Sequence, residues 1–301
     1  MPMIVLVPDD HGVAALAGVD GVTPVRYSVS EPLPEAGRDA EVMVVALGSV
    51  DRLSAFMREL PRLRLVQALN AGTEQWDGRL PEGVSLSNAR GAHGGSTAEW
   101  AAAVLLTMYR EMTEFASDQA AATWRFRVTD TLAGKSVLVL GAGDLATNLQ
   151  RRLEPFGVRT TLVGRRPRPG VNSLADLPGL LGEHDAVVVM LPLTRETRHI
   201  VDAGFLARMR DGAILVNAAR GPLVDTDALL AELESGRLRA ALDVTEPEPL
   251  PPDHPLWRAP GVLITPHVAG ATRGFQDRAW AVAAAQIAQY AAGRPPENLV
   301  V

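Results

Sequence analysis

The sequence predicts an α/β protein of two domains, the longer of which contains a doubly wound parallel sheet. Short apolar runs alternate with amphipathic or turn-rich stretches along nearly all of the 301 residues. One of these runs, 137–140, is followed at once by a Gly-x-Gly-x-x-Ala turn and a helical pattern. Hydrophobic residues make up 47% of the chain, which is enough to build two separate cores.

The first part of the chain is expected to form the smaller domain. Its patterns predict a helix at Val50–Leu60 and strands at Met3–Val7, Val42–Leu47, Leu63–Leu69 and Val84–Leu86. Helical stretches between strands favour parallel pairing. The last helix of the chain, Phe275–Ala292, is expected to return and pack on this domain. The predicted domain therefore comprises residues 1–97 together with 273–301.

A glycine-rich loop, GAHGGST, leads into a long helical pattern at Thr97–Phe115. Ser96 or Thr97 is its expected N-cap. Apolar positions wrap too far around this helix for a solvated surface, so we expect it to be buried between domains or between subunits.

Residues 98–272 carry a second strand–helix series, which predicts the Rossmann-type domain. Helices are expected at Leu145–Leu153, Asp202–Met209 and Asp227–Leu233. Strands are expected at Val137–Leu140, Thr160–Val163, Ala186–Met190, Ala213–Val216, Ala240–Val244 and Val262–Thr265. Ligands of such a fold bind at the edge where its parallel strands end.

The turn after the first of these strands predicts a dinucleotide site. Gly141 permits the tight turn, Gly143 lets a pyrophosphate approach, and Ala146 lets helix and strand pack closely. Expected cofactor contacts here are Gly141, Ala142, Gly143, Asp144 and Leu145. Asp144 is favourable at a helix N-terminus but would repel a phosphate, so either its side chain points away or cofactor affinity suffers.

The next strand predicts which dinucleotide binds. In the usual NAD fingerprint, an acid about 20 residues past the glycines holds the ribose 2′-hydroxyl. Here the second strand is instead followed by Gly164, Arg165, Arg166, Pro167 and Arg168. Loss of the acid removes repulsion from a 2′-phosphate, and arginines supply charged donors to it. We therefore expect NADP(H), with Arg165 as the main contact and Arg166 beside it. NAD(H) is the alternative, if this basic turn is only solvated.

Polar residues at three other strand ends indicate chemistry on a carboxylic acid. Arg220 has the planar fork that binds a carboxylate, and His267 has a side chain that moves protons near neutral pH. A carboxylate of the segment that carries Glu246 and Glu248 would hold the imidazole in one tautomer, and these residue types alone leave both glutamates open. Asp243 lies at the same edge and could either contribute to this site or only form the turn after its strand. The remaining histidines are expected to be structural or exposed, with His199 at a helix start; His93 alone is a candidate for contact with substrate.

These segments resemble the D-2-hydroxyacid dehydrogenase family. The similar features are GAGDLA, MLPLTRETRHIV, VNAARGPLVD, ALDVTEPEPLP and TPHVAG, in the family's order and near its spacing. The resemblance implies a smaller, flavodoxin-like α/β substrate domain. It also implies that Arg220, Glu248 and His267 are catalytic, and that Asp243 faces the nicotinamide carboxamide. Main-chain amides of Asn70, Ala71, Gly72 and Thr73 would help to hold the substrate carboxylate, and further cofactor contacts would be Pro192, Ala218, Ala219 and Gly270.

The expected function is NAD(P)H-dependent reduction of a small 2-oxo acid, similar to glyoxylate or hydroxypyruvate, to the D-2-hydroxy acid. A bulkier 2-oxo acid and phosphite are alternative substrates. The alternative from another class is a non-catalytic dinucleotide-sensing protein of the same fold. The resembling family forms a twofold dimer through the region of helix 98–115 and the Trp124–Phe126 arm, so a homodimer is expected here; packing between the domains of one protomer is the alternative.

Bulk properties exclude several other classes. The net charge of −6 with no basic face argues against nucleic acid as the main partner. The absence of cysteine excludes disulfides, thiolate metal sites and a cysteine nucleophile, and no histidines and carboxylates recur at metal-ligand spacing. The N-terminus does not resemble a signal peptide, and no apolar run reaches the length of a membrane span, so a cytoplasmic protein without a membrane partner is expected.

Overall fold

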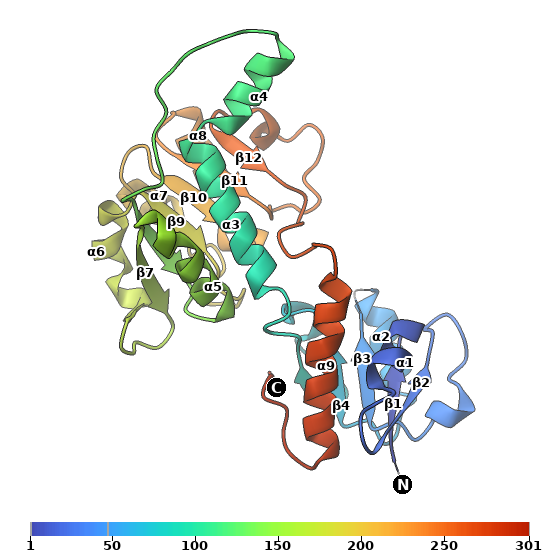
Figure 1. Cartoon of the computed structure of the whole chain (residues 1–301). Helices are drawn as coiled ribbons and strands as arrows, with labels where there is room; N and C mark the ends of the chain where they lie inside the picture. The colour runs from blue at the N-terminus through green and yellow to red at the C-terminus, as the bar shows by residue number, and fades with distance from the viewer. Residues whose placement is uncertain (1, 47, 301) are drawn as a thin grey trace. The chain divides into compact units, whose positions relative to one another are not determined.

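The computed structural model describes residues 2–46 and 48–300, which form two compact units (Figure 1). One unit contains the residues up to His93 together with those from Arg273 onward, and the other is Gly94–Thr272. The first boundary thus lies earlier than residue 97, where the sequence analysis placed it, because helix formation already begins at Gly94. Residues 1, 47 and 301, which the predicted domain and the predicted strand Val42–Leu47 include, lie outside the described residues.

The first unit contains a parallel sheet of five strands in the order β2-β1-β3-β4-β5. The strands are β1 (Met3–Val7), β2 (Val22–Arg26), β3 (Val42–Val45), β4 (Leu65–Ala68) and β5 (Ser85–Ser87). β2 was not predicted from the sequence, because this edge strand is only half-buried and contains Pro24. An edge strand tolerates proline because one side of its backbone makes no ladder hydrogen bonds.

Helices cover both faces of this sheet. α2 (Val50–Met57) packs with Phe56 and Met57 on one face. α1 (Asp10–Leu16), which was not predicted, and α9 (Phe275–Ala291) pack on the other, where Trp280 and Ile287 are buried against the strands. The last helix therefore returns to the first unit, as predicted.

The second unit contains a parallel sheet of seven strands in the order β12-β11-β10-β9-β6-β7-β8. The strands are β6 (Ser136–Leu140), β7 (Arg159–Gly164), β8 (Val171–Ser173), β9 (Ala186–Val189), β10 (Ile214–Asn217), β11 (Arg239–Leu242) and β12 (Val262–Ile264). The predicted six are present, and the added β8 is a three-residue edge strand too polar to give an apolar run. Since the chain moves outward from β6 in both directions, the loop after β6 lies at the topological switch point, where such sheets bind ligands.

Side chains alternate between the two faces of this sheet and so build two cores. α3 (Gly94–Tyr109) and α5 (Asp144–Leu153) cover one face. The other face is covered by α6 (Leu177–Leu180), α7 (Ala203–Arg208) and α8 (Thr226–Glu234). Helices on both faces of a parallel sheet make this the predicted doubly wound, Rossmann-type domain.

The predicted single helix Thr97–Phe115 is wrong at both ends. α3 begins at Gly94, so Ser96 and Thr97 lie inside the helix and neither is its N-cap. α3 ends at Tyr109, and α4 (Met112–Ala120) follows Glu111, whose φ of 49° breaks the helix. α3 is buried along much of its length, whereas α4 has no buried residue and projects from the rest of its unit in Figure 1.

Candidate active site

The glycine turn after β6 has the shape that a pyrophosphate needs. The Gly141 N–H donates to Val163 O at 2.7 Å, and a Cβ at Gly141 would lie 2.7 Å from the main-chain oxygen of Met190. With its φ of 131° as well, this position requires glycine. Gly143 is the N-cap of α5, and a Cβ there would meet nothing within 4 Å. The turn therefore leaves open space at a helix N-terminus, which fits a dinucleotide phosphate.

The Asp144 carboxylate points away from this open space. One of its oxygens, Oδ1, accepts a hydrogen bond from Asn148 Nδ2 at 2.9 Å. The other, Oδ2, is buried against Gly94, at the N-terminus of α3. A negative charge is favourable there because of the positive end of the helix dipole. Of the two outcomes that the sequence allowed for Asp144, the structure has the first.

The basic turn after β7 is joined to the glycine turn. Arg165, Arg166 and Arg168 are exposed, and Arg168 Nη2 donates to Ala142 O at 2.6 Å. Gly164 is buried, and a Cβ there would lie 3.1 Å from Val171 and 3.3 Å from Ala142. Sequence reasoning singled out Gly164 and Arg165 but missed the contact of Arg168, which depends on how the two turns fold together.

His267 and Glu248, predicted as a pair, are in contact. His267 Nδ1 and Glu248 Oε1 are 2.6 Å apart. The backbone at His267 is left-handed, with φ 55°, and its N–H donates to Asp243 O at 2.7 Å. A strained residue of this kind is maintained only where its surroundings hold it. This contact occupies Nδ1, so Nε2 is the ring nitrogen that does not face Glu248.

Asp243 supplies much of that support. Its carboxylate is 3% exposed and accepts three hydrogen bonds from the His267 loop, namely from Thr265 Oγ1 at 2.6 Å, Val268 N at 2.8 Å and Ala269 N at 2.9 Å. These donors offset the cost of burying a charged group. Sequence reasoning missed this role of Asp243, because nothing in a spacing pattern shows that one carboxylate organises the next strand's loop.

Arg220 follows β10, the neighbour of β11 in the sheet. Buried Asn217 fixes the turn before it: Asn217 Nδ2 donates to Arg220 O at 2.9 Å, and its Oδ1 accepts from Ala219 N at 3.1 Å. The half-buried Arg220 side chain contacts Ala219 O through Nη1 at 2.7 Å. Because β10, β11 and β12 are adjacent and parallel, the loops that carry Arg220, Glu248 and His267 lie at one edge.

The structure separates the two rival glutamates. Glu246 pairs with Arg198 and His199, at 2.6 and 2.9 Å, whereas Glu248 alone reaches His267. The prediction that His199 lies at the start of a helix is wrong. His199 lies in a turn with φ 51°, and α7 begins at Ala203.

Other predicted cofactor residues lie on loops at this same edge. Pro192 follows β9, Ala218 and Ala219 follow β10, and Gly270 follows β12. Pro192 O accepts from Thr197 Oγ1 at 2.8 Å, and Gly270 O accepts from Ser96 Oγ at 3.5 Å.

The predicted substrate loop belongs to the first unit. It follows β4, where Asn70 Nδ2 donates to Gly72 O and Asn88 Nδ2 donates to Ala71 O at 2.9 Å. His93 is half-buried in the same unit, and burial lowers its pKa despite the opposing effect of a main-chain hydrogen bond with Leu69. This burial favours the neutral imidazole of His93, the histidine predicted as a candidate for contact with substrate.

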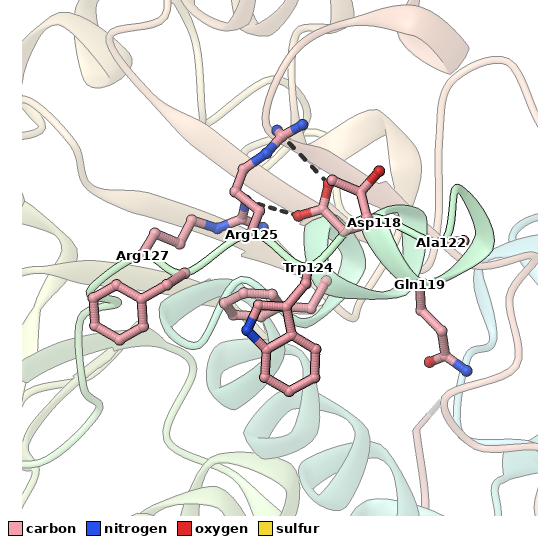
Figure 2. A pocket seen from close by; sticks show the side chains of 9 residues that line it. Asp118, Gln119, Ala122, Trp124, Arg125 and Arg127 are labelled. Carbon is pink, nitrogen blue, oxygen red and sulfur yellow. Dashed lines mark hydrogen bonds and ion pairs between the residues drawn. The ribbon is translucent and has the colours of Figure 1, made fainter.

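A hollow of about 710 Å³ lies between α4 and the segment after it (Figure 2). It is lined by Phe115, Asp118, Gln119 and residues 122–127, none of which is a predicted site residue. Among the described residues, no group of three or more possible metal ligands is present. The same part of the chain has no helix that is long and apolar enough to cross a bilayer.

Known proteins resemble this chain in sequence and in fold. Residues 102–269 match the model of the D-isomer specific 2-hydroxyacid dehydrogenase, NAD binding domain. A glyoxylate reductase of Aeropyrum pernix is 33% identical, over 90% of this chain and 85% of its own length. A glyoxylate/hydroxypyruvate reductase B of Yersinia enterocolitica is 30% identical, over 89% of this chain and 86% of its own.

Two solved structures extend the comparison. An NADPH-dependent glyoxylate/hydroxypyruvate reductase of Sinorhizobium meliloti, in complex with NADP and sulfate, has a TM-score of 0.82 and 30% identity, and the match covers 99% of this chain and 98% of that one. A D-isomer specific 2-hydroxyacid dehydrogenase of Xanthobacter autotrophicus, in complex with NADPH and MES, has a TM-score of 0.84 and 32% identity over 100% and 98% of the two chains.

Proposed function

This chain belongs to the D-isomer specific 2-hydroxyacid dehydrogenase family, and we propose that it reduces a small 2-oxo acid, of the glyoxylate or hydroxypyruvate type, to the D-2-hydroxy acid with NADPH. The observation that carries this proposal is the contact of 2.6 Å between His267 and Glu248. This contact lies at the edge of the sheet where the glycine turn opens. Reduction of a carbonyl there needs a general acid that protonates the carbonyl oxygen.

Three side chains have distinct roles in this proposal. The Arg220 fork binds the substrate carboxylate and draws electron density from the adjacent carbonyl. His267 Nε2 gives its proton to the carbonyl oxygen as that oxygen becomes negative. Glu248 holds the imidazole by Nδ1 and stabilises its protonated form. When bound, the nicotinamide supplies the hydride that adds to the carbonyl carbon.

We assign cofactor binding to the unit Gly94–Thr272, which also carries Arg220 and His267, and further substrate contacts to the other unit. Main-chain amides of Asn70, Ala71, Gly72 and Thr73 would hold the substrate carboxylate together with Arg220. The cofactor phosphates would lie on the turn Gly141–Leu145, and the remaining contacts would come from Pro192, Ala218, Ala219, Asp243 and Gly270. The open space at Gly143 supports this assignment.

We assign NADP(H) as the preferred cofactor, bound through its 2′-phosphate by Arg165 and Arg166. In support, Gly164 is buried and a Cβ there would already contact Val171 and Ala142, so a larger acidic residue would not fit without a shift. The complexes of the Sinorhizobium and Xanthobacter proteins with NADP and NADPH also favour it. A higher kcat/KM for NADH than for NADPH would contradict this assignment.

Exposed aromatic residues support a homodimer. Trp124 and Phe126 are 99% and 86% exposed, which is unusual for isolated side chains of this size. Asp118 pairs with Arg125 at 3.6 Å and with Arg127 at 3.1 Å (Figure 2), and these two arginines are the sequence neighbours of Phe126. The segment is thus held in shape while its aromatic side chains project, which suits contact with a second copy of the chain.

The reaction is tested by following NADPH oxidation with glyoxylate, hydroxypyruvate, pyruvate and phenylpyruvate. We expect turnover at about 1–1000 per second with glyoxylate or hydroxypyruvate. Turnover of phenylpyruvate alone would replace the proposed substrate with a bulkier 2-oxo acid. NADPH binding without turnover of any 2-oxo acid would instead favour a dinucleotide-sensing protein.

A further inference from the structure

The loop between β11 and Glu248 is held by two side chains, Arg198 and His199, from one distant segment. Glu246 Oε1 lies 2.6 Å from Arg198 Nη2, and Glu246 Oε2 lies 2.9 Å from His199 Nε2. Both oxygens of the carboxylate are therefore engaged. Burial raises the pKa of the Glu246 carboxyl, but hydrogen bonds from His199 and Arg198 outweigh burial and lower that pKa. The lowered pKa keeps the Glu246 carboxylate ionised at neutral pH.

The main chain of the same loop is also fixed. Thr226 Oγ1 donates to Glu246 O at 2.8 Å, and Thr245 Oγ1 donates to Pro247 O at 2.8 Å. A Cβ at Gly221 would lie 1.9 Å from Thr245 O, so the loop after Arg220 packs directly on this one. The backbone of this loop is thus held from two sides. The Glu246 side chain in addition joins the loop to the segment of Arg198 and His199.

By contrast, the contact between His267 and Glu248 is only weakly stabilised by the two side chains themselves. The side chains of His267 and Glu248 are 47% and 41% exposed. An ion pair as exposed as this one is weakened by solvent and by the freedom of its own side chains. The short contact between them must therefore depend on where the backbone places Glu248, two residues after Glu246.

We propose that Glu246, held by Arg198 and His199, is a positioning residue that keeps the Glu248 carboxylate on Nδ1 of His267. This inference rests on the proposed function, in which His267 donates the proton. A carboxylate on Nδ1 favours the imidazolium, so it extends the pH range in which His267 carries the proton that reduction needs. A purely structural clamp would affect stability and leave that range unchanged.

The test is the pH dependence of kcat/KM for 2-oxo acid reduction in the full chain with Glu246→Gln. We expect kcat to fall about tenfold, with KM for the 2-oxo acid nearly unchanged. We also expect the alkaline limb of the profile to move down by about half to one pH unit, because His267 loses its proton earlier when Glu248 is displaced. The other charged groups around this loop and His267, namely Arg220, Asp243, Arg198 and His199, are unchanged in this variant.

Two matched variants make the result decisive. Glu232→Gln removes a carboxylate that also lies 2.6 Å from an arginine, Arg237, at the opposite edge of the same sheet, and should leave the alkaline limb in place. Glu248→Gln should move the limb at least as far as Glu246→Gln does. A limb that moves with Glu248→Gln but not with Glu246→Gln overturns the positioning role alone. A limb that moves with neither variant overturns the proposed role of Glu248, and the positioning role with it.

A second pair of variants covers the case in which Glu246→Gln does not fold. Arg198→Ala should lower kcat and move the alkaline limb in the same direction, and Arg198→Lys, which keeps a cation near Glu246 Oε1, should recover most of the wild-type profile. An Arg198→Ala profile with the wild-type limb and kcat would overturn the inference.

Discussion

A single residue, His267, shows how much of the site is built by its surroundings. Its left-handed backbone is an unfavourable conformation for most residues, with φ 55°. The loop around it is nevertheless fixed, because the buried Asp243 carboxylate accepts hydrogen bonds from Val268 and Ala269 directly after it. The strain is thus offset by charge-assisted hydrogen bonds, each of which contributes about 1.5–3 kcal/mol.

Residue types at strand ends singled out Arg220, His267 and a segment with two glutamates, since the carboxyl edge of a parallel sheet is where ligands bind, and the family resemblance then favoured Glu248. The contacts of Glu246 could not be predicted in the same way. Its partners, Arg198 and His199, come from a different strand end, and the sequence offers TEPEP as two equivalent glutamates. Only the folded loops distinguish the glutamate that meets the imidazole from the one that holds the loop.

Arg165→Asp tests the cofactor assignment at the level of one residue. The change removes a donor to the 2′-phosphate and restores an acid that can accept from a ribose hydroxyl, so preference should shift toward NADH by at most about 3–5 kcal/mol. The ratio of kcat/KM for NADPH to that for NADH measures the shift. An unchanged ratio would mean that the basic turn does not contact the cofactor.

At the scale of elements, the sequence predicted apolar strands well, the half-buried edge strand β12 included, and missed two edge strands with few apolar residues. The four strands β6, β9, β10 and β11 are apolar and almost fully buried, so their runs stand out. The missed strands β2 and β8 are edges with mixed side chains. α3 began early for a tertiary reason. Gly94 has low helix propensity, but the Asp144 carboxylate of α5 packs against it, and a negative charge there favours a helix N-terminus.

Asp185 joins the amino ends of three strands and gives a stability prediction with a defined pH dependence. Its Oδ2 accepts from the N–H and the hydroxyl of Ser136, both at 2.8 Å, and its Oδ1 pairs with Arg210 at 2.9 Å. Burial raises the pKa of Asp185, but the two hydrogen bonds from Ser136 and the charge of Arg210 outweigh burial and lower it. The ionised form therefore stabilises the fold at neutral pH.

Asp185→Asn should lower the free energy of unfolding by about 1–2 kcal/mol near pH 7. Since the folded-state pKa is lowered, the contribution is complete above the ordinary carboxyl pKa and is lost as pH falls through the lowered value. Urea unfolding at neutral pH and below about pH 4 should show the difference from wild type shrink in acid. A difference that is equal at both pH values would contradict this role of the charge.

For the whole molecule, the sequence predicted two domains and a return of the last helix, because each part has its own alternation of strands and helices. It could not predict which contacts hold the chain where it passes from one unit to the other, after His93 and after Thr272. Arg278 of α9 donates to Ala92 O and to Arg273 O, both at 3.1 Å, on the first-unit side of the two crossings. Arg278 and Ala92 are 186 residues apart in the sequence, so no local pattern contains that contact.

Oligomeric state gives a prediction at this scale. The full chain should have twice the mass of one protomer by light scattering at micromolar concentration, because burying Trp124 and Phe126 removes about 150–250 Å² of surface per side chain from water. Trp124→Ser with Phe126→Ser should give the mass of one protomer. Trp257→Ser, a control at a tryptophan that is 47% exposed and outside the arm, should leave the mass unchanged. A wild-type chain that scatters as a protomer would refute the dimer.

The central claim is that His267 donates the proton in reduction of a 2-oxo acid, and His267→Asn tests it most directly. Asparagine tolerates the left-handed backbone at this position, so the loop should keep its shape while the proton donor is lost. The measurement is kcat for NADPH oxidation with glyoxylate, made alongside a titration of NADPH binding. We predict a fall in kcat of at least about 100-fold with NADPH affinity unchanged, whereas a kcat equal to that of the wild type would contradict the account.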